Sequence, residues 1–258
     1  MMTYCNSYSN LPPSVQDPQQ LETLSPKYGF FNTQNMLQTF LKSGFMVSGG
    51  EAIRTRKKDP RSVKHLLRFR AENAELLNGV YPEVVLTNSH DGTSTLRLLC
   101  GLFRLICSNG LIICDGTFAP PIIIRHTHLG ILTVQNSIKK IMETTLAVSH
   151  RIPKLAEISM TPVMEEAYAE KAAALLPTPI VSKQLLFARR EADCVSNLWI
   201  IYNRVQENIM RGGVKTTHVN IRRGSTRAVA NINRNVTLNS KLWQLTMEFA
   251  GNHGSATV

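Results

Sequence analysis

The chain has 258 residues, 43% of them hydrophobic, and 29 Lys and Arg against 18 Asp and Glu give a net charge of +11. This length and composition suit one large domain or two small ones, and no apolar run reaches the roughly 18 residues of a membrane span. The N-terminus lacks the pattern of a signal peptide, so we expect a cytoplasmic protein. Three of the five cysteines, Cys100, Cys107 and Cys114, lie in apolar runs at a spacing that no zinc knuckle uses, and we interpret them as core residues.

The N-terminal third alternates between polar stretches and short patterned segments. Residues 1–25 are polar and show no hydrophobic period, which predicts a disordered or loosely docked tail. Apolar residues at helical spacing predict a short helix over 32–43. Phe45–Arg56 is predicted as a strand with a bulge at its paired glycines. Val63–Arg70 alternates with a period of two, which predicts a half-buried strand with a basic outer face.

The most informative stretch runs from Val84 to Cys114. It consists of β-branched and apolar residues interrupted by two turn signals, 88–92 and 108–110, so it predicts three consecutive strands. The middle strand, 95–107, is apolar at both parities, which favours burial on both faces. Ile122–Ile124 predicts one more strand.

From Thr133 onward the pattern becomes helical. A Thr-Pro pair with acidic residues in the next turn marks the start of one helix, and a Gly-Gly pair closes another. The stretch 214–235 is rich in Asn, Thr, Gly and Arg, and we expect it to be a mobile basic arm. Four helices are predicted. The first begins at Thr133, the second runs from Thr161 to a stop at Pro177, the third from Asn197 to Arg211, and the fourth from Asn239 to Ala250.

Strands first and helices afterwards indicate an α+β fold. We expect a curved antiparallel β-meander sheet with helices packed on one face and a mainly helical C-terminal half. The predicted organisation is a single domain over 26–258, mainly β over 26–130 and mainly α over 131–258.

Two clusters of basic residues are candidate phosphate-binding surfaces, because each cation that neutralises a phosphate releases condensed counterions. Each cluster also has an alternative interpretation without a ligand. The one at 54–70 could be a charged sheet edge that resists aggregation, and the one at 211–234 could be a loop without a partner. The first cluster comprises Arg54, Arg56, Lys57, Lys58, Arg61, Lys64, Arg68 and Arg70, and the second comprises Arg211, Lys215, Arg222, Arg223, Arg227 and Arg234.

A set of polar residues in the apolar block forms a motif of unknown role: Asn88, Ser89, His90, Asp91, Arg97 and Arg104. His90 and Asp91 could be an acid–base or metal-binding pair, but neighbours on a strand point to opposite faces. We therefore favour a turn made by Asp91 and Gly92. His126 and His128 share a strand face, yet no carboxylate or thiolate companion is evident for a metal.

The chain carries no Walker loop, HExxH, nucleophile elbow or dinucleotide-binding glycine motif. No cofactor and no metal site is therefore predicted, and we do not expect an enzyme. A metal-dependent activity that uses the histidines above is the weakest of three hypotheses.

Several long motifs resemble one family. They are NSHDG followed by an apolar strand and CSNGL, the basic strand 61–70, NLWIIYNRVQENIMRGGV at 197–214, and the arginine-rich stretch with its final helix at 222–249. The chain is similar here to the phage, prophage and plasmid proteins of the YfjQ/YafZ/YubP type. The resemblance implies a role in a bacterial mobile genetic element.

Two functions follow as hypotheses. The first is a nucleic-acid-binding accessory protein of a phage or mobile element, with single-stranded DNA as the favoured partner, which acts as a homo-oligomer in strand annealing or recombination. The fold-level likeness to annealing proteins is analogy only. The alternative is an anti-defence protein that binds a host defence protein or a signalling nucleotide. Neither hypothesis involves a membrane.

Overall fold

The structure is a computed structural model of residues 1–258, and the part described here has several gaps. Its secondary structure begins with short α1 (Pro13–Gln16) and ends with the long helix α8 (Ile232–His253). The described residues are 10–53, 55–56, 58–76, 79–104, 110–113, 119–127, 133–217 and 224–253. The elements between the first and last helices are α2 (Thr33–Lys42), β1 (Phe45–Ala52), β2 (His65–Ala71), β3 (Val80–Asn88), β4 (Leu96–Arg104), β5 (Gly110–Ile113), β6 (Ile122–Ile124), α4 (Val134–Ser149), α5 (Ile152–Glu157), α6 (Pro162–Ala173), two 3-10 helices η2 (Ser182–Leu186) and η3 (Glu191–Asp193), and α7 (Leu198–Arg211).

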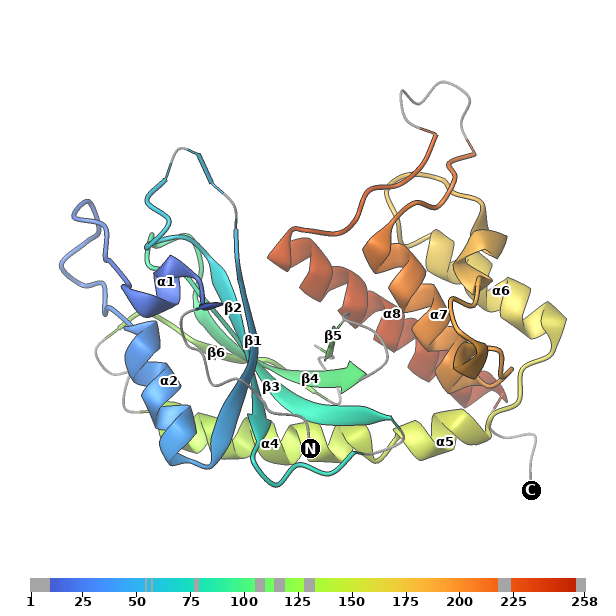
Figure 1. The fold of residues 1–258 in the computed structure, drawn as a ribbon, viewed down its shortest axis with the longest axis horizontal. Coiled ribbons are helices and arrows are strands. Elements are labelled where there is room, and N and C mark those ends of the chain that lie inside the picture. The colour runs from blue at the N-terminus through green and yellow to red at the C-terminus, as the bar shows by residue number, and fades with distance from the viewer. Residues whose placement is uncertain are drawn as a thin grey trace. The chain divides into compact units, whose positions relative to one another are not determined.

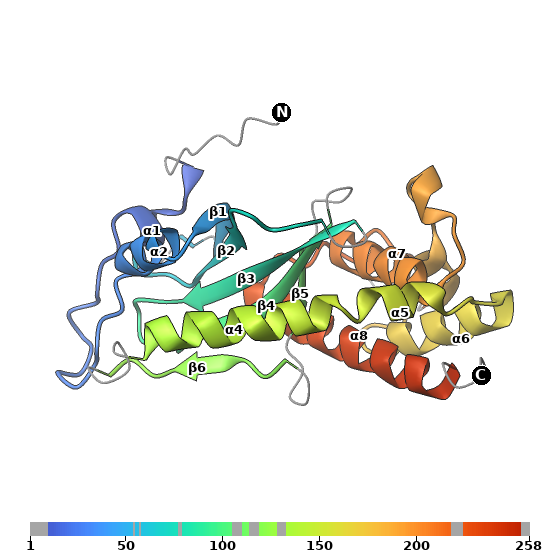
Figure 2. The same cartoon turned by 90° about the horizontal axis from the view of Figure 1, so that it is seen from below.

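An open antiparallel sheet confirms the predicted α+β class (Figure 1). The strands follow the order β1-β2-β3-β4-β5, and β6 pairs with β4. The β1–β2 register shifts between Val47 and Gly49, so the strand has a bulge at Ser48, one residue before the paired glycines where it was expected. Figure 2 shows α4 running across the sheet. Ile138, Ile141 and Thr145 of this helix are buried.

Contacts divide the chain into two compact units. The first contains the described residues within Met1–Leu76, Val80–Phe103 and Gly116–Ala147, and the second those within Leu77–Gly79, Arg104–Asp115 and Val148–Val258. The first unit therefore extends past residue 130, where the sequence placed the change from β to α, and includes most of α4. The single domain over 26–258 stays a prediction.

The core of the first unit centres on β2. The Phe40 ring from α2 stacks on Phe69 at 3.9 Å between centroids, and Leu67 is fully buried. The other side of β2 is also covered, since Arg70 is only 5% exposed and Arg68 lies over the Phe103 ring at 4.3 Å. The predicted basic outer face of this strand is therefore wrong, because aromatic rings cover it.

Part of the predicted tail is packed. In α1 the side chains of Ser14 and Val15 are fully buried, and the Ser14 carbonyl accepts a hydrogen bond from His90 Nε2 at 3.0 Å. This corrects the prediction for residues 13–16, because Val15 supplies an apolar anchor that the polar composition around it obscures. The first nine residues lie outside the described part.

The polar motif after β3 ties that anchor to the sheet. The Thr33 hydroxyl lies 2.8 Å from His65 Nε2 and 3.1 Å from His90 Nε2, and Asn88 Nδ2 donates to it at 3.0 Å. His65 Nδ1 lies 3.0 Å from the Val63 carbonyl, which can only accept, so it carries the proton of a neutral ring. Thr33 then donates to His65 and accepts from His90 and Asn88.

This arrangement needs both rings neutral, and it makes stability pH-dependent. Burial, with the charge of the neighbouring His90, lowers the pKa of His65 to about 3. Burial, with the charge of His126, lowers the pKa of His90 to about 4. An unfolded histidine titrates near about 6.5, so from there downward the unfolded chain binds protons that the folded chain does not. Stability is therefore fully present above that pH and is lost as the pH falls toward the folded values.

We expect the free energy of unfolding to drop between pH 6.5 and pH 4.5, by up to about 1.4 kcal/mol per pH unit for each of the two histidines. Urea unfolding of the full chain at several pH values measures this slope. A variant of the exposed His150, His150→Gln, should keep the same slope. Equal stability at pH 6.5 and pH 4.5 would contradict the neutral histidine pair.

The second unit is helical, and its boundaries follow the sequence signals. Thr161 caps α6 through a hydrogen bond from Met164 N, and the Asn197 side chain caps α7 by accepting from Ile200 N. Gly212, with φ +71°, ends α7. These three ends confirm the predicted starts and stop.

The last helix is longer than the sequence predicted. It begins at Ile232 because the Asn231 side chain accepts from Arg234 N at 3.0 Å, as an N-cap does. Before it, Thr226 N donates to the Val214 carbonyl and Thr216 N to that of Gly224. The described parts of the stretch 214–235 are thus paired backbone and helix. This corrects the prediction of a mobile arm for residues 214–217 and 224–235, because backbone partners replace the missing apolar anchors there. Residues 218–223 lie outside the described part.

In the described parts of the chain, no helix combines the length and the hydropathy that a membrane crossing requires.

Candidate functional site

Helix α7 carries an unusual buried polar face. Trp199, Tyr202 and Val205 supply its apolar contacts, and Tyr202 meets the Trp243 ring of α8 edge-on at 5.9 Å. Yet a run of polar side chains on the same helix is also buried. These are Asn203, Arg204, Gln206, Glu207 and Asn208, each at most 8% exposed. Buried polar groups need partners, so their contacts reveal what the helix holds in place.

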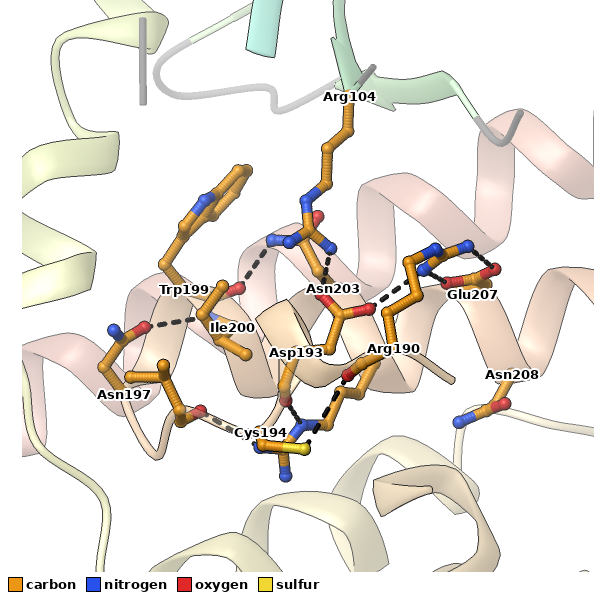
Figure 3. Close-up of polar contacts among 12 residues, drawn as sticks. Arg104, Arg190, Asp193, Cys194, Asn197, Trp199, Ile200, Asn203, Glu207 and Asn208 are labelled. Carbon is orange, nitrogen blue, oxygen red and sulfur yellow. Dashed lines mark hydrogen bonds and ion pairs between the residues drawn. The ribbon is translucent and has the colours of Figure 1, made fainter. Parts of the chain in front are cut away.

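Glu207 and Asp193 organise an ion network (Figure 3). Arg190 binds both Glu207 oxygens at 2.8 Å and Asp193 Oδ2 at 2.9 Å. Arg104 Nη1 lies 2.6 Å from Asp193 Oδ1. Burial alone would raise the pKa of Glu207, but the hydrogen bonds from Arg190 and the charges of Arg190 and Arg211 hold it below its usual value. Glu207 is therefore charged near neutral pH, and both acids are paired with arginines.

The other polar residues of α7 hold backbone. Arg204 donates from Nε to the Asp193 carbonyl and from Nη2 to the Val195 carbonyl at 3.0 Å. Asn208 Nδ2 donates to the Leu185 and Phe187 carbonyls, both at 2.9 Å. This helix thus fixes the path of the segment 185–195, which contains no long helix of its own.

That segment forms one wall of an open groove of about 730 Å³. The Phe187 side chain lines it and is 63% exposed, although its backbone is held by Asn208. Arg189 also lines it and donates from Nε to Asn208 Oδ1 at 3.0 Å. The remaining lining residues are Lys183, Gln184, Leu186, Asn208, Gly212, Gly213 and Val214.

The edge of this groove is positively charged. Lys183 forms an exposed ion pair with Glu166 at 2.8 Å. This pair contributes little to the stability of the fold, because water screens it. Lys215 is exposed and directly follows the lining residue Val214. Its backbone is fixed at the groove because Lys215 N donates a hydrogen bond to Gln184 Oε1 at 2.7 Å. Among the residues that the structure describes, no acid forms an ion pair with Arg189 or Lys215. An exposed aromatic ring beside such cations can contact both a base and a phosphate.

The first basic cluster is largely neutralised. Lys58 pairs with Asp91 at 2.8 Å, Arg61 with Asp59 at 2.7 Å, and Arg70 with Glu83 at 2.6 Å. Arg68 lies 3.8 Å from the same Glu83. The predicted positive ribbon is thus interrupted by Asp59 within it and by Glu83 and Asp91 from two other segments.

The two remaining members that the structure describes differ in exposure. Lys64 is buried, and burial together with the charge of Arg97 lowers its pKa. Arg56 is exposed. Arg54 and Lys57 lie outside the described residues.

The second basic cluster keeps more free charge. Arg211 pairs with Glu207 at 3.0 Å. Lys215, Arg227 and Arg234 are exposed, and no acid in the described parts of the chain forms an ion pair with them. Arg222 and Arg223 fall outside the described residues.

The motif of unknown role divides between the two units. His90 and Asp91 point to different partners, and Asp91 accepts from Thr93 N at 3.1 Å, as expected of a turn. Ser89 Oγ accepts from Ser94 N, and half-buried Arg97 lies 3.4 Å from Thr95 Oγ1. Arg104 belongs to the ion network of the second unit. Sequence reasoning missed Phe187, Arg189, Arg190 and Asp193, whose only signal was a cationic, aromatic stretch without helical period.

No metal centre is assembled by the described residues, where no three His, Cys, Asp or Glu side chains come together. His126 stacks on Tyr28 at 4.7 Å between ring centroids, and its Nδ1 lies 3.2 Å from the Gly29 carbonyl. Its predicted companion His128 lies outside the described residues.

Comparison with known proteins places the chain in a family. Residues 20–243 match the model of DUF932, a domain of unknown function. The chain belongs to the DUF932 family. This DUF932 chain is 32% identical over 240 residues to YfjQ, a UPF0380 protein of Escherichia coli K12, covering 90% of this chain and 85% of YfjQ. It is equally similar to YafZ of the same organism, with the same coverage.

These relatives confirm the resemblance drawn from the NSHDG and RVQEN motifs. Neither the family description nor the names of the two relatives state an activity. No solved structure matches the chain.

Proposed function

We propose that this DUF932 protein binds single-stranded nucleic acid, with DNA favoured, through the groove beside η2 and α7. The observation that carries the proposal is the exposed Phe187 ring at a groove flanked by Arg189 and Lys215. A ring stacks on any unpaired base, and the cations neutralise the backbone phosphates. Duplex bases are already stacked on each other, so a ring in a groove favours single strands.

The polar face of α7 supports this reading. Both ends of the Asn208 side-chain amide bind the groove wall: its nitrogen donates to the Phe187 carbonyl, and its oxygen accepts from Arg189 Nε. The Phe187 backbone and the Arg189 guanidinium are thereby held before a ligand arrives. Preorganisation of this kind lowers the entropy cost of binding.

The biological setting is part of the same proposal. The net charge of +11 favours a polyanionic partner. The protein would act in the bacterial cytoplasm as an oligomeric accessory protein of a mobile element or phage, with strand annealing during recombination as the task. In this role it binds and does not catalyse.

Fluorescence anisotropy tests the proposal with labelled single-stranded DNA, RNA and duplex DNA, at salt concentrations of about 50 and about 200 mM. We expect tighter binding to single strands, weakened at the higher salt concentration, and light scattering of the same sample should show an oligomer. Equal affinity for duplex DNA would contradict the role of Phe187. No binding at the lower salt concentration would overturn the proposal and favour a host protein as the partner.

A further inference from the structure

A second, smaller hollow of about 290 Å³ adjoins the groove, since Val214 lines both. Ile209 and Val229 form part of its apolar lining, and Thr226, Arg227 and Arg234 contribute polar groups. Its volume falls at the lower limit of ligand pockets, so it suits one small molecule or one unit of a polymer.

The wall that carries Arg227 is fixed by backbone contacts. Gly213 N donates to the Thr226 carbonyl at 2.9 Å, and Thr226 N donates to that of Val214 at 2.8 Å. Val229 N donates to the Met210 carbonyl at 2.9 Å. Gly212 has no side chain because a Cβ there would lie 2.4 Å from the Arg227 backbone carbon. The hollow is therefore a built feature of the second unit.

The charge of the hollow identifies its ligand class. Arg227 and Arg234 are both exposed, and the described residues provide neither with an acidic partner. Among the described residues that line it there is no acid, whereas four hydroxyl residues, Thr178, Thr216, Ser225 and Thr226, belong to it. Guanidinium groups together with hydroxyls are the donors that bind phosphate oxygens.

We propose that this hollow binds the phosphate monoester of a single nucleotide. A monoester carries about two negative charges near neutral pH, which match the two arginines, and the apolar lining accepts part of the sugar or base. The ligand is either a free nucleoside monophosphate or the phosphorylated end of a strand in the neighbouring groove. The second source alone rests on the proposed function.

Two arms of one experiment separate these sources. Calorimetry compares adenosine monophosphate with adenosine, and anisotropy compares a 5′-phosphorylated single strand with the same strand ending in a hydroxyl. We expect the phosphate to tighten binding about tenfold or more in at least one arm, since a hydrogen bond to a charged group is worth about 1.5–3 kcal/mol. The double variant R227Q/R234Q should lose this gain, whereas Arg189→Gln, in the groove, should keep it.

The outcomes distinguish this inference from nucleic-acid binding itself. A gain in the calorimetric arm alone assigns the hollow to free nucleotides, and a gain in the anisotropy arm alone assigns it to strand ends. If neither phosphate tightens binding, or if R227Q/R234Q retains the whole gain, the inference is overturned. Binding of the hydroxyl-ended strand then still decides the proposed function separately.

Discussion

Replacing Asp193 by asparagine is expected to lower the free energy of unfolding of the second unit by about 3 kcal/mol. The Asp193 carboxylate is 2% exposed and pairs with Arg104, whose side chain is 7% exposed. The described residues give Arg104 no other acid, so the variant leaves a buried guanidinium without a counter-charge. Removing one partner of a buried pair costs far more than the pair contributes, because the remaining charge stays desolvated.

Urea unfolding measures this difference, and the chain offers a matched control. Asp17 pairs with Arg61 at 3.4 Å, but both side chains are largely exposed. Asp17→Asn should therefore cost less than about 1 kcal/mol. A similar cost for the two variants would show that the Arg104–Asp193 pair is not desolvated in solution.

Replacing Phe187 by alanine is expected to weaken single-strand binding by about 5- to 150-fold, because stacking on an aromatic ring is worth about 1–3 kcal/mol per base. Fold stability should hardly change, since the ring is 63% exposed and its carbonyl still accepts from Asn208. Anisotropy with a labelled single strand at fixed salt measures the loss.

Two further variants show whether the loss comes from stacking. Phe187→Trp keeps an aromatic face and should restore binding. Val163→Ala removes a similarly exposed apolar side chain from α6, away from the groove lining, and should bind like the wild type. If Phe187→Ala binds as tightly as Val163→Ala, the ring does not contact bases.

Local signals in the sequence predicted the elements well. The Thr161 cap, the Asn197 cap and the glycine after α7 each act within a few residues, so the sequence contains the whole cause. The bulge in β1 was predicted to within one residue for the same reason. The early start of α8 was missed because Asn231 lies in a polar stretch whose backbone partners come from elsewhere.

The candidate site was less predictable, because the sequence gives the number of basic residues but not the acids that pair with them. Glu83 and Asp91 neutralise basic residues that precede them by 13 and 33 positions. Arg104 pairs with an acid of η3 that lies much farther along the chain, and nothing local predicts this pairing. Only the fold shows which cations of a basic protein remain unpaired.

The same limit applies to the NSHDG motif. Its turn was predicted correctly, since Asp91 accepts from Thr93 N two residues on. The partners of His90 come from α1 and from Thr33, which only the tertiary structure brings to it.

The central claim is that the unpaired cations of the second unit, and not the paired cations of the first, bind nucleic acid. The most direct test compares R189Q/K215Q with K58Q/R61Q in anisotropy titrations of single-stranded DNA over a salt series. Each double variant removes two positive charges. The salt slope of log K should become shallower by about 1.4 for R189Q/K215Q, with about tenfold weaker binding, and should change little for K58Q/R61Q. Equal losses in the two variants, or a larger loss in K58Q/R61Q, would contradict this assignment.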